Sequence, residues 1–372
     1  MITKKVLILS EAFGAGHTKV AEALKEGISL FAPSVHTKIV ELGQELNPLT
    51  TTLMFRLYVK LITTYPYLWG KTYQKKQDQP LSKGYQFIIY QLFHRKIEAL
   101  LEHEKPNLVI CTHPFSSSSV SRLKRLGCPL NLCTVITDFH AHGVYAQPEV
   151  DLYLVSSDGV QQELINLGVQ QNRIMITGIP TKTKFWIKND KQEIRRKLQL
   201  KNIPTVMLMG GGLGLGGIGR VAHMLTKWRE DLQVVICTGY NQTLKQSLSK
   251  NRCFHHPHIH ILEFVDIIDE WMDASDLIIT KPGGVSCFEA LLKGIPMLLY
   301  KPIPGHEEKN CDFLIQNRFA IKVDSLIEVE AWIQNLLFSP REVDLLQRRI
   351  VNFKQKIDPL ESYRSIMKLL VP

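Results

Sequence analysis

Short apolar runs alternate with amphipathic segments from one end of this chain to the other. In the first half they predict strands at residues 6–10, 36–41, 108–112, 131–137, 151–156 and 174–177. In the second half they predict strands at residues 205–209, 233–237, 260–263, 277–280 and 296–300. Helical patterns lie between most of these runs, for example at residues 18–30, 218–228 and 286–292. Such alternation is typical of parallel sheets covered by helices on both faces, so we expect an α/β fold.

The chain is too long for one compact core. Its 372 residues fit two domains of ordinary size. A charged stretch of little periodicity follows Pro180, and we place the interdomain linker there, at residues 181–202. Residues 1–180 and 203–345 then form two Rossmann-like domains, and the helical tail at 346–372 is expected to pack back on the first. Such sheets bind ligands beyond the carboxyl ends of their strands, so two edges facing across a cleft would bring two substrates together.

The composition is basic. The formal net charge is +10 and the isoelectric point is about 9.1, which indicates an anionic partner: nucleic acid, an acidic membrane surface or a phosphorylated substrate. The seven cysteines are scattered and form no C-x-x-C, so we expect a reducing compartment and no disulfide framework. No apolar stretch reaches the ~18 residues of a membrane span, and the N-terminal run is too short for a signal peptide. The expected location is cytoplasmic, bound peripherally to the inner face of the cell membrane.

Glycine-rich loops follow two strands of the second domain. The stretch MLMGGGLGLGG, at residues 207–217, holds six glycines whose backbone can approach an anion closely, Gly211 and Gly212 among them. It is not a Walker A loop, because no G-K-[ST] follows. The second loop, KPGG at residues 281–284, leads into a helix whose first N–H groups and dipole favour an anion. The alternative for the first loop is a tight strand–helix turn, and the alternative for the second is ordinary capping chemistry.

The first strand of the chain leads into FGAGHTKVAEAL, at residues 13–24. This stretch is either a phosphate cradle or a support for a catalytic histidine. If the second domain holds a diphosphate, Gly14 and Gly16 are free to make a tight turn that brings His17 to the edge of the sheet. An imidazole with a pKa near ~6.5 suits removal of a hydroxyl proton near neutral pH. The alternative is a histidine that only packs at a helix start.

Two other strand ends of the first domain carry polar side chains. In TDFHAHGVY, at residues 137–145, Asp138 could orient His17 or bind an acceptor, and His142 could do either. His113, in the stretch Thr-His-Pro, ends another strand and would line the same cleft. The alternative for these residues is an Asx-type turn with surface histidines.

These motifs together resemble a known family. The stretch WMDASDLIITKPGGVSCFEALLKGIPMLLYKPIPGHEEKN, at residues 271–310, looks like the donor-binding segment of glycosyltransferase family 28. The branch that it resembles most is that of the diacylglycerol glucosyltransferases and monogalactosyldiacylglycerol synthases. FGAGHTKVAEAL, TDFHAHGVY, TGIP and the glycine loop fall in the family's order, so the resemblance spans nearly the whole chain. It implies the GT-B fold, with the donor in the second domain and the acceptor in the first.

The resemblance also implies a UDP-sugar donor and a role for each residue around it. His17 would be the catalytic base or a partner of the acceptor hydroxyl. The donor residues would be Phe264 and Val265 for uracil, Glu289 for ribose, Gly283, Gly284, Val285 and Ser286 for the diphosphate, and His306 and Glu307 for the sugar. The family usually has Gly-Gln-Glu where this chain has Gly-His-Glu, so the choice between glucose and galactose stays open.

The predicted reaction is an inverting displacement. The base takes a proton from diacylglycerol, whose hydroxyl attacks the anomeric carbon of the hexose as UDP leaves, and processive addition is compatible with this chemistry. The chain has no D-x-D pair, so we expect the helix start and the glycine loop to neutralise the diphosphate, with no cofactor and no required divalent metal. The alternatives are transfer of N-acetylglucosamine from its UDP derivative to a polyprenyl lipid intermediate, a UDP-sugar epimerase on the same fold, and a non-catalytic sensor.

Residues 55–96 are rich in aromatic and basic side chains. They include ten aromatic residues and eight lysines and arginines, against the single acid Asp78. This mixture fits an anionic membrane interface, and it also fits single-stranded nucleic acid or a solvated face over core aromatics. The family resemblance favours the membrane, since diacylglycerol lies there. The histidine-rich stretch at residues 253–260 has no familiar zinc-ligand spacing and is interpreted as a loop.

Overall fold

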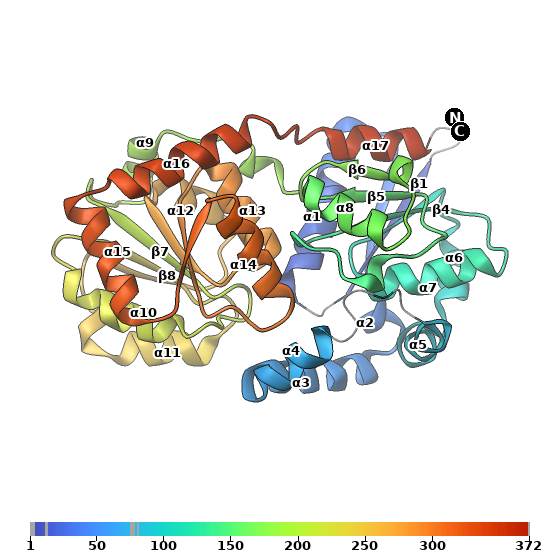
Figure 1. Ribbon diagram of the computed structural model, residues 1–372, viewed down its shortest axis with the longest axis horizontal. Helices are drawn as coiled ribbons and strands as arrows, with labels where there is room; N and C mark the ends of the chain where they lie inside the picture. Colours follow the sequence, from blue (N-terminus) through green and yellow to red (C-terminus); the bar gives the residue numbers. More distant parts are fainter. Residues whose placement is uncertain (1–3, 12–13, 75–78, 80–81, 371–372) are drawn as a thin grey trace. The chain divides into compact units, whose positions relative to one another are not determined.

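The computed structural model describes residues 4–11, 14–74, 79 and 82–370. Phe13 of the opening motif and part of the basic segment, including Asp78, lie outside the described residues. The chain forms two compact units (Figure 1). The first comprises Met1–Thr183, Pro304–His306 and Ile357–Pro372, and the second comprises Lys184–Ile303 and Glu307–Lys356.

The first unit is built on a six-stranded parallel sheet of order β2-β1-β3-β4-β5-β6. Its strands are β1 (Lys5–Ser10), β2 (His36–Glu41), β3 (Leu108–Cys111), β4 (Asn131–Val135), β5 (Leu152–Val155) and β6 (Ile174–Ile176). The helices of this unit are α1 (Ala15–Phe31), α2 (Leu42–Leu46), α3 (Pro48–Thr64), α4 (Pro66–Gln74), α5 (Lys83–Ile89), α6 (Ile97–Glu104), α7 (Pro114–Arg125), α8 (Asp158–Asn166) and α17 (Glu361–Leu370). A π-helical turn, η1 (Tyr90–His94), continues α5.

The second unit holds another six-stranded parallel sheet, of order β12-β11-β10-β7-β8-β9. Its strands are β7 (Thr205–Met209), β8 (Gln233–Cys237), β9 (Ile259–Leu262), β10 (Leu277–Thr280), β11 (Met297–Tyr300) and β12 (Ala320–Val323). Its helices are α9 (Lys191–Lys197), α10 (Ile218–Leu225), α11 (Gln242–Lys250), α12 (Ile268–Ala274), α13 (Gly284–Lys293), α14 (His306–Gln316), α15 (Leu326–Phe338) and α16 (Arg341–Lys354). The first residue of α14, His306, is grouped with the first unit.

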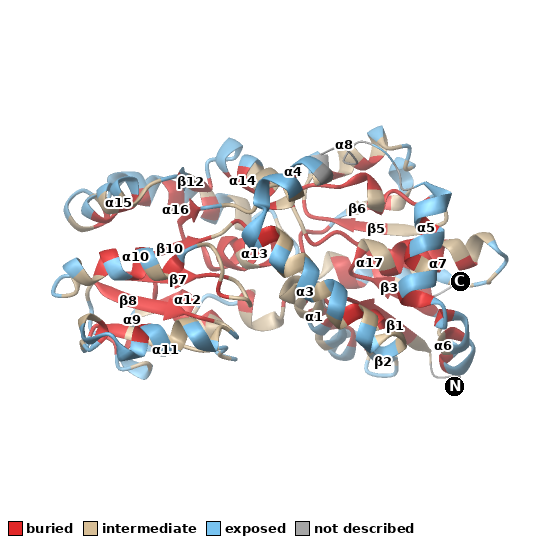
Figure 2. Ribbon diagram, turned by 90° about the horizontal axis from the view of Figure 1, so that it is seen from below, coloured by how far each residue is buried: buried red, intermediate tan, exposed pale blue. Residues whose placement is uncertain are grey.

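Both sheets are buried by helices on their two faces (Figure 2). The central strands β1, β3, β7 and β10 are therefore continuous apolar runs rather than alternating ones. Each unit has its own core cluster, which contains Leu7 and Val109 in the first and Val206 and Ile279 in the second. Among the described residues, no helix combines the length and the hydropathy that crossing a bilayer requires.

The α/β fold class is confirmed, and every predicted strand is present within two residues of its expected ends. Strand β12 was missed, because it is a short edge strand whose apolar pattern is interrupted by Lys322. The first helix was expected to begin at residue 18, but α1 begins at Ala15. Gly14 takes a φ of 113°, which only glycine adopts readily, and the chain enters the helix at once.

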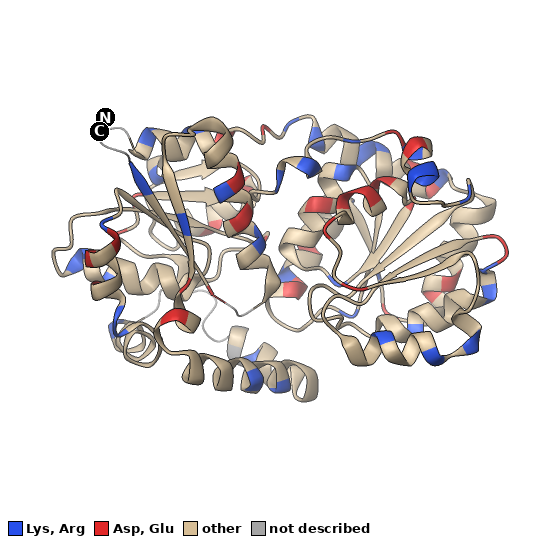
Figure 3. Cartoon of the chain, turned by 180° about the vertical axis from the view of Figure 1, so that it is seen from behind, with Lys and Arg blue, Asp and Glu red and all other residues tan. Residues whose placement is uncertain are grey.

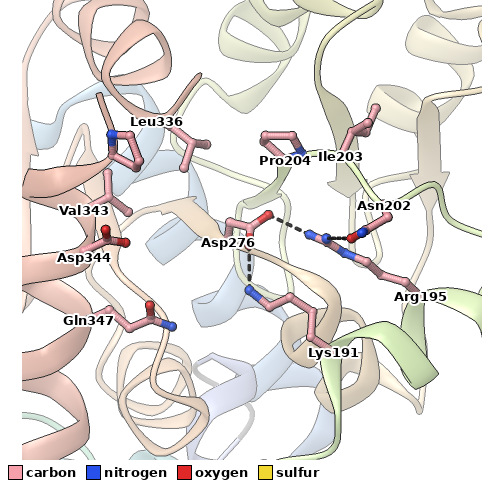
Figure 4. A pocket seen from close by; sticks show the side chains of 11 residues that line it. Lys191, Arg195, Asn202, Ile203, Pro204, Asp276, Leu336, Val343, Asp344 and Gln347 are labelled. Carbon is pink, nitrogen blue, oxygen red and sulfur yellow. Dashed lines mark hydrogen bonds and ion pairs between the residues drawn. The ribbon is translucent and has the colours of Figure 1, made fainter. Parts of the chain in front are cut away.

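The structure corrects the expected linker at residues 181–202. Residues 184–202 lie within the second unit, because α9 is held there by ion pairs (Figure 4). Lys191 Nζ and Arg195 Nη2 lie 2.6 Å from the two carboxylate oxygens of Asp276. The buried Arg195 also donates to the carbonyl of Ala274, and the group lines a cavity of about 280 Å³. The sequence does not reveal these ion pairs, because Asp276 lies about 80 positions away from Lys191 and Arg195 in the chain.

The tail is also divided differently from expectation. It was predicted as one helical segment at residues 346–372 that packs on the first domain. Helix α16 belongs instead to the second unit, and only α17 belongs to the first. Tyr363 of α17 is buried against Gly27 of α1, and its hydroxyl donates to the carbonyl of Ala23.

Candidate functional site

Each sheet reverses its strand order at one point. In the first unit this point lies between β1 and β3, which lead into the segments carrying His17 and His113. In the second unit it lies between β7 and β10, which lead into the glycine loop and into Lys281. Open parallel sheets bind ligands beyond the carboxyl ends of their strands at such switch points. Both predicted sites therefore occupy the places where this type of sheet binds ligands.

His17 is held by the backbone of the neighbouring strand end. It lies half-buried in the first turn of α1, and its Nδ1 is 2.6 Å from the carbonyl oxygen of Thr112 and 3.2 Å from Oγ1 of Thr137. A carbonyl oxygen can only accept, so Nδ1 carries the proton. In the neutral ring Nε2 is then the basic nitrogen.

The electrostatic surroundings keep this ring neutral near pH 7. Burial lowers the pKa of His17 below its ordinary 6.5, because the imidazolium loses hydration, and the Asp138 carboxylate opposes this shift. Burial also holds the pKa of His113 well below its ordinary value. The two rings meet edge-on, with centroids 4.6 Å apart. The site can therefore accept a proton at His17 without first losing one.

The other predicted acceptor residues lie in two different settings. His113 caps α7, since its Nδ1 accepts from the N–H of Phe115 at 3.1 Å, and it packs on His17. His142 uses both ring nitrogens on the backbone: Nδ1 accepts from the N–H of Val144, and Nε2 donates to the carbonyl of Tyr73 at 3.3 Å. His142 thus ties α4 to the loop after β4. The carboxylate of Asp138 is half-buried and raises the pKa of His17.

A buried polar cluster beside this site was not predicted. His94 Nε2 lies 2.6 Å from Oε1 of Glu11, and its Nδ1 lies 2.6 Å from Oγ of Ser119. The other carboxylate oxygen of Glu11 accepts from the N–H of Gly43, where a Cβ would come within 2.8 Å of it. The cluster joins the end of β1 to η1 and α7. No motif marks it, because Glu11 and His94 are 83 positions apart.

The glycine loop of the second unit is locked to the next strand end. The N–H of Tyr240 donates to the carbonyl of Gly212 at 2.9 Å, and a Cβ at Gly239 would lie 2.5 Å from the same oxygen. The exposed ring of Tyr240 stacks on the exposed ring of Phe264, with centroids 4.7 Å apart and planes 10° apart. Beside Phe264, Val265 is half-buried. Tyr240 was missed by the sequence analysis, although a tyrosine directly after a strand–glycine turn is a signal that could have found it.

Helix α13 begins at Gly284, after the N-cap Gly283, which has no side chain to cap it. Gly283 therefore offers no side-chain acceptor to the N–H groups in the first turn of α13. Val285 is buried and Ser286 is half-buried. Glu289 is buried in the second turn of this helix.

The predicted sugar-facing pair is split by the structure. Pro304–His306 group with the first unit, whereas Glu307 belongs to the second. The carboxylate of Glu307 is buried, and it pairs with Lys281 and accepts from the N–H of Ile303 at 2.8 Å. Across the part of the chain that the structure describes, no three His, Cys, Asp or Glu residues are arranged to hold a metal ion.

The described part of the basic segment forms an unusually exposed helical surface. Helix α3 has 17 residues and buries only Thr51 and Ile62. The exposed apolar side chains of α3, α4 and α5, and of Tyr65 between α3 and α4, include Leu49, Leu53, Leu57, Tyr65, Tyr67, Leu68, Tyr85, Phe87 and Ile88. Helix α3 carries Arg56 and Lys60 and no acid, and Figure 3 shows basic but no acidic residues on it.

Comparison with known families gives two matches in chain order. Residues 17–181 match the family described as monogalactosyldiacylglycerol (MGDG) synthase. Residues 205–327 match the family described as glycosyltransferase family 28 C-terminal domain.

The matching curated relatives include two named processive diacylglycerol beta-glucosyltransferase. The protein from Bacillus licheniformis is 30% identical over 353 residues, which cover 93% of this chain and 90% of the relative. The protein from Bacillus subtilis is 31% identical over 357 residues, which cover 94% of this chain and 91% of the relative.

Solved structures share the fold at low identity. MurG of Acinetobacter baumannii superposes with a TM-score of 0.62 at 13% identity, over 98% of this chain and 99% of that one. MnaA of S. aureus, solved with UDP, gives a TM-score of 0.64 at 14% identity, over 98% and 95%. HepE of Anabaena, solved with UDP-glucose, gives 0.61 at 13% identity, over 98% and 99%. These likenesses show a GT-B fold.

Proposed function

Because this chain belongs to glycosyltransferase family 28, in the branch of the diacylglycerol glucosyltransferases and monogalactosyldiacylglycerol synthases, we propose that it transfers a hexose from a UDP-sugar to diacylglycerol. Glucose is the favoured hexose, since the two relatives described above are named glucosyltransferases. Transfer proceeds with inversion at the anomeric carbon, and the product is a membrane glycolipid.

The observation that carries this proposal is the state of His17. Its Nδ1 is committed to the carbonyl of Thr112, and its ring is neutral near pH 7, so Nε2 is a free base at a ligand-binding switch point. A transferase needs such a base to activate a hydroxyl acceptor. A protein that only senses a nucleotide sugar has no use for it.

In the proposed reaction, Nε2 of His17 takes the proton of the diacylglycerol hydroxyl. The hydroxyl oxygen forms a bond to the anomeric carbon, and the bond from that carbon to the diphosphate oxygen breaks. The electron pair of this bond leaves with UDP. Asp138 stabilises the imidazolium that forms, because its carboxylate favours the charged ring.

The second unit is the proposed donor site. The uracil base would lie against the stacked rings of Tyr240 and Phe264, beside the backbone of Val265, and the ribose near Glu289. The diphosphate would be bound by the glycine loop at Gly211 and Gly212 and by the N-terminus of α13. The solved neighbours MnaA and HepE, which contain UDP or UDP-glucose, support a UDP-sugar as the donor. No divalent metal is required in this proposal.

The exposed surface of α3, α4 and α5 is the proposed membrane-docking face. Its apolar and aromatic side chains would enter the interface of the lipid, and its basic residues would meet anionic headgroups, at about 1 kcal/mol for each charge close to the surface. This arrangement brings the enzyme to an acceptor that does not leave the bilayer. The protein would therefore act peripherally.

The test is a transfer assay with purified protein. Diacylglycerol in vesicles that contain anionic phospholipid is mixed with UDP-glucose, UDP-galactose or UDP-N-acetylglucosamine, with a chelator present. Mass spectrometry identifies the lipid product, and NMR identifies its anomeric configuration. We expect a β-glucosyl lipid from UDP-glucose, formed equally well with and without chelator.

A His17→Ala variant tests the proposed catalytic base. It should lose about 10²- to 10⁴-fold in turnover, since general-base catalysis contributes that much, while its affinity for UDP is unchanged. Full activity of this variant would remove His17 as the base. Conversion of a UDP-sugar without any glycolipid, from every donor tried, would favour an epimerase.

A further inference from the structure

Lys281 lies at the switch point of the second sheet. It directly follows β10, whose last residue Thr280 pairs in register with Met209 of β7, and β7 leads into the glycine loop. The lysine and the loop therefore leave the same edge of the sheet on adjacent strands. Its position next in sequence to Pro282 and the start of α13 places it between the two predicted diphosphate-binding elements.

The side chain of Lys281 lies against the glycine loop. A Cβ added at Gly211 would be 3.0 Å from its Cε and 3.6 Å from its Nζ, and one at Gly216 would be 3.5 Å from its Cβ. A residue other than glycine at position 211 would crowd Cε of Lys281, and the φ of 65° at Gly211 also favours glycine. The loop is thus shaped around this lysine.

A buried carboxylate fixes the lysine in place. The side chain of Lys281 is 16% exposed, and its ammonium pairs with Glu307, whose side chain is 1% exposed. The other oxygen of Glu307 accepts from the N–H of Ile303. Glu307 is therefore oriented from both sides, while Lys281 has two further N–H donors for another acceptor.

We propose that Lys281 is the cation that neutralises the diphosphate leaving group, and that Glu307 is the positioning residue that holds it. This inference rests on the proposed function and assigns its leaving-group chemistry. As the bond from the anomeric carbon to the diphosphate oxygen breaks, that oxygen gains the electron pair and a negative charge. Lys281 donates a hydrogen bond to the diphosphate and stays protonated throughout, so it supplies what a divalent metal supplies in other sugar transferases.

Two other cations lie near the loop, at its far end. Arg220 and Lys301 come within 4 Å of a Cβ placed at Gly217, and Lys301 also lies over the ring of Tyr300. Lys281 runs along the loop, with its backbone end near Gly216 and its ammonium end near Gly211, the residue that opens the loop after β7 and Gly210. Lys281 also pairs with the buried carboxylate of Glu307, which orients its ammonium group.

The experiment compares UDP with UMP as ligands of the purified protein, by calorimetry in the presence of a chelator. UMP has the base, the ribose and the first phosphate of UDP. It lacks the second phosphate, to which the hexose is bonded in a UDP-sugar. The variants are Lys281→Met, Glu307→Gln and the double variant Lys281→Met/Glu307→Gln, which leaves no buried charge unpaired. Lys227→Met removes an exposed lysine of the same unit and is the control.

We expect wild type and Lys227→Met to bind UDP more tightly than UMP. Both variants that lack Lys281 should lose about 10- to 100-fold in affinity for UDP, as expected for a charge-assisted hydrogen bond, and little for UMP. Glu307→Gln should keep a preference for UDP, because the lysine remains charged. In the transfer assay the Lys281 variants should lose about 10²-fold or more in turnover.

Two results would overturn the assignment, and they differ in meaning. If the Lys281 variants keep the full preference for UDP over UMP, the lysine does not contact the diphosphate, although the proposed function stands. If wild type binds neither nucleotide, the donor half of the proposed function fails, and the role of Lys281 fails with it.

Discussion

His17 and Lys281 occupy corresponding places in the two units. Each follows a central strand at the switch point of its sheet, and each is oriented by one nearby acceptor, the carbonyl of Thr112 or the carboxylate of Glu307. The two acceptors differ in charge, and so do the proposed roles. Burial keeps His17 an uncharged base although the hydrogen bond to Thr112 and the Asp138 carboxylate both raise its pKa, whereas Lys281 forms an ion pair with a buried carboxylate.

At the scale of single residues, the pH dependence of kcat/KM tests the coupling of Asp138 to His17. The activity of the wild type should fall only below pH 6.5, because burial lowers the pKa of His17 and the base must be unprotonated. Asp138→Asn removes a charge that raises this pKa. The acid limb of its profile should therefore move to lower pH, while its maximal rate falls. An acid limb that stays in place or moves to higher pH would show that the two residues are not coupled.

At the scale of elements, α3 is the helix that packing explains least. Its sequence is helical and largely apolar, yet it buries two of its 17 residues. Apolar helices in water-exposed positions normally meet a partner, and the basic residues on this one match an anionic lipid surface. The cluster of Glu11, His94 and Ser119 anchors the other end of the same segment to the sheet, so the exposed helices are attached through η1 and α7.

Replacement of Leu53 and Leu57 by serine tests the role of α3. Their side chains are 58% and 52% exposed, so the fold should be unchanged by circular dichroism. Binding to vesicles that contain anionic phospholipid should weaken by at least about tenfold, from the apolar area that no longer enters the lipid. Sedimentation of the protein with vesicles measures this. Leu30→Ser, at an exposed leucine of α1, is the control and should bind like the wild type.

At the scale of the whole molecule, both ends of the chain belong to the first unit. Helix α17 follows α16, which belongs to the second unit, and it docks on α1 through Tyr363. The ring of Tyr363 fills the space that Gly27 leaves open and stacks on Phe31 with centroids 5.3 Å apart. The first unit is thus completed by residues from the far end of the chain.

Truncation of this side chain should destabilise the first unit. Tyr363→Ala removes a fully buried ring and should lower the free energy of unfolding by about 3–5 kcal/mol, whereas Tyr363→Phe removes only one hydrogen bond and should cost about 1 kcal/mol. Urea unfolding followed by intrinsic fluorescence measures both. Equal stability of the alanine variant and the wild type would mean that α17 does not stabilise this unit.

Local pattern was sufficient for the elements. Most strands, and the helices α1, α10 and α13, were predictable because a buried strand is a continuous apolar run and a surface helix is amphipathic, whatever lies elsewhere in the chain. The exceptions have local causes as well: Lys322 hides β12, and the positive φ of Gly14 starts α1 early. The glycine loops and His17 could be proposed as functional on the same basis, since each lies in the segment that follows a predicted strand.

Strand order and long-range contacts were decided by the tertiary structure. The periodicity of β1, β3, β7 and β10 does not say which strands are neighbours, so only the folded sheets show that two switch points carry His17 and Lys281. The pairing of Glu11 with His94 joins residues 83 positions apart, and the bond from Tyr363 to Ala23 spans 340 positions. Such contacts leave no periodic mark in the sequence, because they depend on the folding of the whole chain between the two partners.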